Sequence, residues 1–183
     1  MKKSTKIIIL VVVGIVMLFL GIVTWFFPYS FFSVNKSVTY DPYNVAVKDY
    51  EKGIDDFKKN YEIDKQTQSI LNMYEQTWLL SENKVRMKYE DLGGMLNKVQ
   101  VARKKLRQIN LGTISPQEKE NRSIIIGNCD VFEKWIEDIK KHKTDSKMKI
   151  NREYQSMMAG YITSFQIFVE FYEIYEKDNQ NTE

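Results

Sequence analysis

Residues 115–143, SPQEKENRSIIIGNCDVFEKWIEDIKKHK, contain the start, the buried face and the end of one long helix. Ser115 and Glu118 form the Ser-x-x-Glu pattern of a capping box, and Pro116 stands where proline is favoured, just inside the helix. Apolar side chains then recur every three or four residues, at Ile125, Cys129, Phe132, Ile136 and Ile139. This spacing predicts a helix with one face buried against other helices.

The same segment holds the only cysteine and the only histidine of the chain, Cys129 and His142. On one continuous helix they would lie about 20 Å apart along the axis and roughly 140° apart around it. A nucleophile and its base must be within hydrogen-bond reach, so these two cannot form a catalytic pair. We interpret Cys129 as a core residue and His142 as a solvated residue at a helix end.

Downstream of the stretch KTDSK (143–147), the spacing predicts a last long helix. Its main apolar stripe consists of Ile150, Tyr154, Met157, Tyr161, Phe165, Phe168, Tyr172 and Tyr175. A second strip, Ile167, Phe171 and Ile174, lies about 120° from the first. This strip either contacts a partner or packs within the chain, against the helix that begins at Val47. We expect burial within the chain.

Upstream, apolar residues occupy eight of nine positions spaced seven residues apart over some sixty residues, a pattern typical of long helices. The positions are Tyr50, Phe57, Asp64, Leu71, Trp78, Val85, Leu92, Val99 and Leu106. The polar stretch 62–69 predicts a break or bend, which leaves open whether 43–110 is one helix, and Gly93-Gly94 is a second weak point. With no strand alternation found, we predict an all-α, up-and-down, coiled-coil-like bundle of three to four long helices over residues 43–178.

At the N-terminus, residues 7–27 form an uncharged apolar run long enough to span a bilayer as a helix. A cleaved signal peptide is the alternative, but its apolar region is usually shorter, and here bulky aromatic residues follow, as at a membrane interface. We favour an uncleaved single-span anchor. Lys2, Lys3 and Lys6 precede the span and only Lys36 follows closely, so the positive-inside rule places residues 1–6 in the cytoplasm.

The remaining residues would then lie outside the cytoplasm, as a linker (28–42), the helical bundle (43–178) and a disordered tail (179–183). Gly14 and Gly21 share one face of the span and could let two copies pack closely, although glycine is common in membrane helices in general. A homodimer is therefore one possible assembly.

Basic residues end the predicted helix before residue 110, at Arg103, Lys104, Lys105 and Arg107. They could contact an anionic surface such as lipid or wall polymer; the alternative is a solvated helix end whose charge suits the helix dipole. The acidic end of the last helix would meet this basic end if the helices alternate in direction. The chain has 27 Lys and Arg against 24 Asp and Glu, and the three lysines before the span account for the whole excess, so nucleic-acid binding is not favoured.

No HExxH, GxSxG, P-loop or CxxC motif occurs, and we predict a non-catalytic protein without cofactor or metal. The expected function is that of a membrane-anchored scaffold or adaptor in a bacterial cell envelope, acting through contacts with other envelope proteins. The alternative is a sensing or immunity module that binds a peptide or lipid through its aromatic C-terminal helix.

Overall fold

The computed structural model describes residues 3–42, 44–109 and 115–180, and the chain is mostly helical, as predicted. In the described residues the elements are α1 (Lys3–Phe26), β1 (Ser37–Tyr40), α2 (Asn44–Asn60), α3 (Lys65–Tyr74), α4 (Thr77–Leu80), β2 (Val85–Lys88), α5 (Asp91–Gln108), α6 (Pro116–Lys141) and α7 (Lys147–Gln180).

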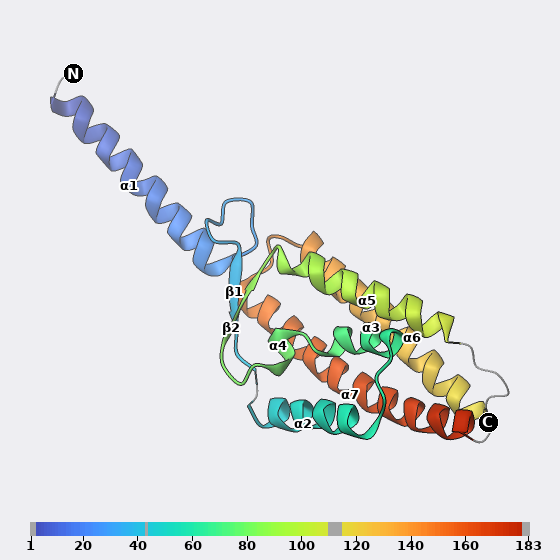
Figure 1. Ribbon diagram of the computed structural model, residues 1–183. Coiled ribbons are helices and arrows are strands. Elements are labelled where there is room, and N and C mark those ends of the chain that lie inside the picture. Colours follow the sequence, from blue (N-terminus) through green and yellow to red (C-terminus); the bar gives the residue numbers. More distant parts are fainter. Residues whose placement is uncertain (1–2, 43, 110–114, 181–183) are drawn as a thin grey trace.

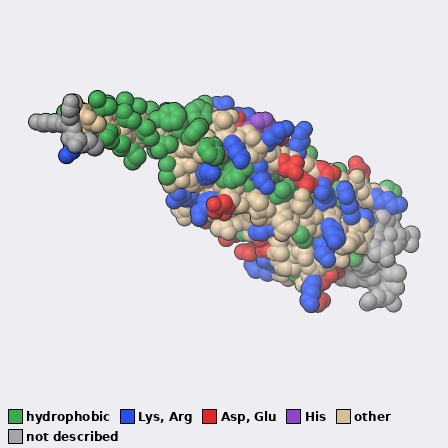
Figure 2. Space-filling model, turned by 90° about the horizontal axis from the view of Figure 1, so that it is seen from above, with side chains coloured by type: hydrophobic (Ala, Val, Ile, Leu, Met, Phe, Trp, Pro, Cys, Tyr) green, Lys and Arg blue, Asp and Glu red, His purple; other side chains and the backbone are tan. Residues whose placement is uncertain are grey.

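Helix α1 projects from the rest of the chain as an isolated apolar rod (Figures 1 and 2). Its stretch Ser4–Phe26 is long and apolar enough to cross a membrane, and none of its most apolar part is buried against the protein. At 1.5 Å per residue, those 23 residues extend about 35 Å, slightly more than a hydrocarbon core. The predicted apolar N-terminal helix is thus present.

The other helices pack beside one another, with α5, α6 and α7 alternating in direction (Figure 1). Helix α6 contacts both α5 and α7, and the shorter α3 packs on α5. Helix α2 covers α7 through aromatic rings, since Phe57 contacts Phe165, Phe168 and Tyr172. The α5 and α7 ends therefore lie on the same side of the domain, away from α1 (Figure 1).

The expectation that the chain has no strands is wrong. Strands β1 and β2 form an antiparallel pair, with Val38 opposite Met87 and Tyr40 opposite Val85. Each strand has only four residues, too few for the alternation of buried and exposed side chains to stand out in the sequence. Since β1 lies within residues 28–42 and Tyr40 is fully buried, the segment that we predicted as a linker is part of the folded domain.

The segment 43–110, for which the sequence left open whether it forms one helix, is broken in several places. The break expected near 62–69 occurs between α2 and α3, where Asp64 caps α3 by accepting a hydrogen bond from the Thr67 amide at 2.6 Å. Further breaks follow at both ends of α4 and around β2. Gly93 and Gly94, expected to weaken a helix interior, lie instead in the first turn of α5, where helical hydrogen bonds are fewest.

The boundaries of α6 match the sequence pattern closely. The Ser115 hydroxyl accepts from the Glu118 amide while the Glu118 carboxylate accepts from the Ser115 amide, which completes the capping box. Its predicted stripe from Ile125 to Ile139 is buried. Helix α7 extends to Gln180, so it includes the start of the predicted 179–183 tail, and residues 181–183 lie outside the described part.

Buried tyrosines join the layers, because their rings fill the core while their hydroxyls find polar partners. Tyr29, three residues beyond α1, donates to the Met87 carbonyl at 3.1 Å and lies 3.0 Å from the Tyr154 hydroxyl. Tyr74 of α3 pairs with the Ser164 hydroxyl of α7 at 2.9 Å. These bonds hold α3, β2 and the residues after α1 against α7.

Candidate functional site: the groove between α2 and α7

An open, mainly apolar groove of about 570 Å³ runs between α2 and α7. One face of each helix lines it, because the contributing residues follow helical spacing. Those of α2 are Ala46, Asp49, Tyr50 and Gly53. Those of α7 are Ile162, Phe165, Gln166, Val169 and Glu170.

The floor of the groove is rigid. The Tyr50 and Phe165 rings contact each other edge to face at 5.5 Å, and both side chains are almost completely buried. The Tyr50 hydroxyl donates to the Tyr74 carbonyl at 3.0 Å, and burial raises the pKa of Tyr50 well above its ordinary value. Tyr50 therefore stays neutral and hydrogen-bonded over the physiological pH range, which fixes the position of α2 on the core.

Gly53 keeps the middle of the groove open. A Cβ atom at this position would lie 3.6 Å from Cε1 of Phe165, an ordinary contact distance, so the backbone does not require glycine. What glycine contributes is space above the Phe165 ring. Ile162 and Val169 line the opposite wall and are only partly buried. An apolar side chain of a partner would cover these surfaces without displacing any part of the chain.

The charge at the rim is negative. Among the lining residues, Asp49 and Glu170 are the charged ones, and both are exposed, one on each helix. A groove with an apolar floor and carboxylates on both sides suits an amphipathic segment with Lys or Arg beside its apolar face.

The second strip of α7 lies elsewhere on that helix. Phe171 is fully buried, whereas Ile167 and Ile174 are partly buried. Phe171 is three helical turns beyond Gly160, and a Cβ at Gly160 would meet Phe132 and Trp135 of α6 at 3.0 and 3.1 Å. The strip thus faces α6. We expected it to face α2, but the rings of α2 instead contact the main stripe at Phe165, Phe168 and Tyr172.

The basic residues Arg103, Lys104, Lys105 and Arg107 lie in the last turns of α5, at the end of the domain away from α1 (Figure 1). Arg103 forms ion pairs with Asp130 and Glu133 of α6. Its carboxylate partners are therefore on α6 and not on the acidic end of α7. Lys104 and Arg107 are exposed.

Cys129 and His142 are placed as the helix geometry requires. Cys129 is fully buried, its Sγ lies 3.7 Å from Sδ of Met73, and burial raises the pKa of its thiol to about 12. His142 caps the C-terminal end of α6 on the surface, with Nδ1 3.0 Å from the Asp138 carbonyl. The thiol remains protonated in the core, and thirteen residues of helix, about 20 Å along the axis, separate Cys129 from the imidazole of His142. The two side chains therefore do not form a nucleophile–base pair.

Gly14 and Gly21 lie on the exposed surface of α1, and a Cβ at either position would meet nothing within 4 Å. In the residues that the structure describes, no group of three or more His, Cys, Asp or Glu side chains could hold a metal ion.

Comparisons with protein-family models, with curated proteins and with solved structures found no match to this chain.

The sequence hinted at the groove without defining it. Ile162 and Val169 are apolar residues beside the main stripe of α7, and Gly53 is the one glycine within residues 44–60. Only the packing of α2 on α7 brings the three together, since Gly53 lies more than a hundred residues before Ile162.

Proposed function

We propose that this protein is a single-span membrane adaptor of a bacterial cell envelope, which holds a partner protein through the groove between α2 and α7. The groove is the observation that carries this proposal. It combines a preformed apolar floor with a charged rim, the usual composition of a site that recognises an amphipathic helix.

The preferred partner segment is a helix with two or three apolar side chains on one face and basic residues beside them. Its apolar side chains would cover Phe165, Ile162 and Val169, and a small side chain would suit the space above Gly53. Its Lys or Arg residues would meet Asp49 and Glu170. Because both carboxylates are exposed, they contribute mainly to orientation and association rate, while the apolar contact supplies most of the affinity.

Membrane attachment supports an adaptor in particular. A span that ends three residues before the buried Tyr29 fixes the domain close to the bilayer and limits its search to the membrane surface. Such tethering raises the effective concentration toward partners in the same membrane. The lysines before the span favour the orientation with the domain outside the cytoplasm.

The test is site-specific photo-crosslinking in intact cells of the source organism, with benzoylphenylalanine at Gln166, an exposed residue of the groove. We expect a discrete crosslinked protein that disappears when Gly53→Leu fills the groove. The matched control places the same photoreactive residue at Lys134, which is exposed on α6.

A crosslink from position 134 of equal yield, or a Gln166 crosslink that persists in Gly53→Leu, would contradict the assignment of the groove. If the crosslinked species at position 166 has only the mass of a short peptide, the groove belongs to a sensing module instead of an adaptor. Circular dichroism of Gly53→Leu checks that the variant is folded.

A further inference from the structure

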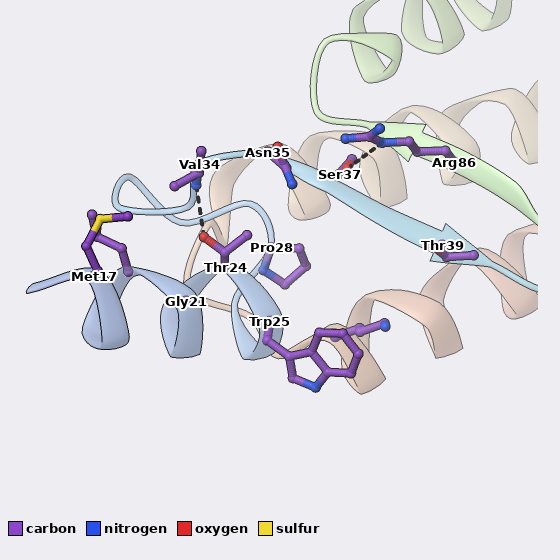
Figure 3. Close-up of a pocket in the computed structure, with 12 residues that line it drawn as sticks. Met17, Gly21, Thr24, Trp25, Pro28, Val34, Asn35, Ser37, Thr39 and Arg86 are labelled. Atoms are coloured by element: carbon purple, nitrogen blue, oxygen red, sulfur yellow. Dashed lines mark hydrogen bonds between the residues drawn. The ribbon is translucent and has the colours of Figure 1, made fainter. Parts of the chain in front are cut away.

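A second pocket, of about 590 Å³, lies where α1 meets the domain. Met17, Leu20 and Gly21 of α1 form its apolar part, and Arg86 of β2 and Lys147 of α7 supply its positive charge (Figure 3). The pocket therefore has the two-part character of an amphiphile: an apolar wall continuous with the span, and cations where the span ends.

The residues after α1 place this pocket at the level of the membrane surface. The chain turns back along α1, so that the Val34 amide donates to Oγ1 of Thr24 at 3.0 Å (Figure 3). The Phe32 ring contacts that of Phe19, with 6.1 Å between the ring centres. Phe31 is 82% exposed and Phe32 57% exposed. Aromatic side chains left bare beside a membrane span are expected to lie in the headgroup and upper acyl region.

Both cations are held in place. Nε of Arg86 donates to Oγ of Ser37 at 2.9 Å, which leaves the Nη groups of the guanidinium as donors toward the pocket (Figure 3). The Lys147 ammonium lies 4.7 Å from the centre of the Trp25 ring, near the end of the apolar run. A guanidinium and an ammonium that line the same pocket give it two cationic groups for an anionic headgroup.

Positive charge is also present on the domain surface beside α1. Figure 2 shows Lys and Arg side chains on the domain surface next to the apolar helix. Arg86 and Lys147 come to the pocket from distant parts of the chain, since β2 and the start of α7 are about sixty residues apart in sequence.

We propose that the pocket binds an anionic phospholipid of the leaflet adjoining the domain, with its phosphate on Arg86 and Lys147 and one acyl chain along Met17, Leu20 and Gly21. This inference rests on the membrane anchoring proposed above. The lipid fits better than a soluble anion because the apolar wall belongs to the span itself and is reached from within the bilayer. Such a lipid would fix the angle between α1 and the domain, and thus the direction in which the α2–α7 groove faces.

The experiment uses the full chain in nanodiscs of phosphatidylcholine mixed with phosphatidylglycerol, followed by native mass spectrometry of the lipids retained on the released protein. We expect retained phosphatidylglycerol to exceed its share of the disc. Each of the substitutions Arg86→Gln and Lys147→Gln should lower this preference about fivefold, the value of one cation near an anionic membrane surface. As a control, the double variant Lys104→Gln/Arg107→Gln removes two positive charges, one more than either pocket variant, from the far end of α5 and should change nothing.

Gly21→Leu tests the apolar half of the pocket. An added side chain at Gly21 meets no neighbour, so the variant should fold and insert while its leucine takes the place of the acyl chain. Gly14→Leu, equally unhindered but outside the pocket, is the control. The inference would be overturned if Gly14→Leu lowered phosphatidylglycerol retention as much as Gly21→Leu. The same holds if Lys104→Gln/Arg107→Gln lowered it as much as Arg86→Gln or Lys147→Gln, or if the unaltered chain showed no preference for phosphatidylglycerol.

Extraction of the chain from vesicles with alkaline carbonate separates the two proposals. Release of the protein by this wash would mean that the anchoring itself is wrong. Retention together with no phosphatidylglycerol preference would overturn the lipid site and leave the adaptor proposal intact.

Discussion

The hydroxyls of Tyr29 and Tyr154 attach the end of α1 to the core, and their hydrogen-bond directions follow from counting protons. A tyrosine has one hydroxyl hydrogen. Tyr29 uses its hydrogen to donate to the Met87 carbonyl at 3.1 Å. The 3.0 Å contact between the two hydroxyls must then have Tyr154 as donor and Tyr29 as acceptor. Both side chains are buried, so water cannot replace either bond.

This direction predicts unequal costs. Tyr154→Phe removes one bond and leaves Tyr29 still donating to Met87, which should lower the free energy of unfolding by about 1 kcal/mol. Tyr29→Phe removes the Met87 bond and leaves the Tyr154 hydroxyl buried without an acceptor, for a loss of about 2–3 kcal/mol. In the double variant the orphaned hydroxyl is gone, so the double loss should fall short of the sum by about 1–2 kcal/mol.

Urea unfolding of the full chain in detergent micelles measures these losses. Tryptophan fluorescence follows the transition, and one of the three tryptophans, Trp78, lies beside the site, with its ring 5.7 Å from that of Tyr154. The reasoning is refuted if Tyr154→Phe costs as much as Tyr29→Phe, because the proton assignment would then be reversed. Additive single losses would refute the bond itself.

Three further predictions use the same unfolding measurement. Gly53→Ala should raise the free energy of unfolding by about 0.5–1 kcal/mol, because its Cβ would lie at an ordinary 3.6 Å from Phe165. Gly160→Ala should lower the free energy of unfolding, since its Cβ would lie only 3.0 Å from Phe132 and 3.1 Å from Trp135. A gain in stability at both positions would contradict the packing. Stability should fall as the pH rises above about 9, because burial raises the pKa of Tyr74 and Tyr154 well above the ordinary value and that of Cys129 to about 12, so the unfolded chain loses these protons at lower pH than the folded chain. Each group lowers the free energy of unfolding by up to about 1.4 kcal/mol per pH unit. Tyr154→Phe should reduce this slope, and a stability that does not change with pH would be inconsistent with these pKa shifts. Cys129→Ser should cost about 1–3 kcal/mol, and His142→Gln should change the unfolding midpoint little; the reverse order would show that the burial of Cys129 is misjudged.

Local signals predicted the helices that carry them. The capping box at Ser115 and the stripe from Ile125 to Ile139 define α6 in the sequence and in the structure alike, because a cap and an amphipathic face depend only on residues within one helix. The apolar run of α1 is of the same kind. The strands were not predictable in this way: β1 is stabilised by β2, almost fifty residues later, and neither strand has an alternating pattern of useful length.

The seven-residue repeat from Tyr50 to Leu106 shows what such a pattern measures. Its apolar members in the helices are all buried, although they are distributed over four helices and the repeat also passes through β2. Seven-residue spacing only requires that each short helix bury the same face as its neighbour, and α2, α3, α4 and α5 all do so against the rest of the domain. The repeat therefore reported burial correctly, while continuity of the helix did not follow from it.

Neither candidate site could be found from the sequence, because both depend on residues that packing brings together. In the groove, the absence of a side chain at Gly53 matters only because Phe165 lies beneath it. In the pocket where α1 meets the domain, Arg86 and Lys147 line one site only because β2 and α7 both lie at the end of α1. Tyr29 brings them there, since its hydroxyl forms hydrogen bonds with Met87 and Tyr154. The same buried tyrosine thus holds the walls of the pocket together and sets the direction of the groove relative to α1. Loss of its hydroxyl should therefore weaken phosphatidylglycerol retention in Tyr29→Phe even under conditions where the domain remains folded.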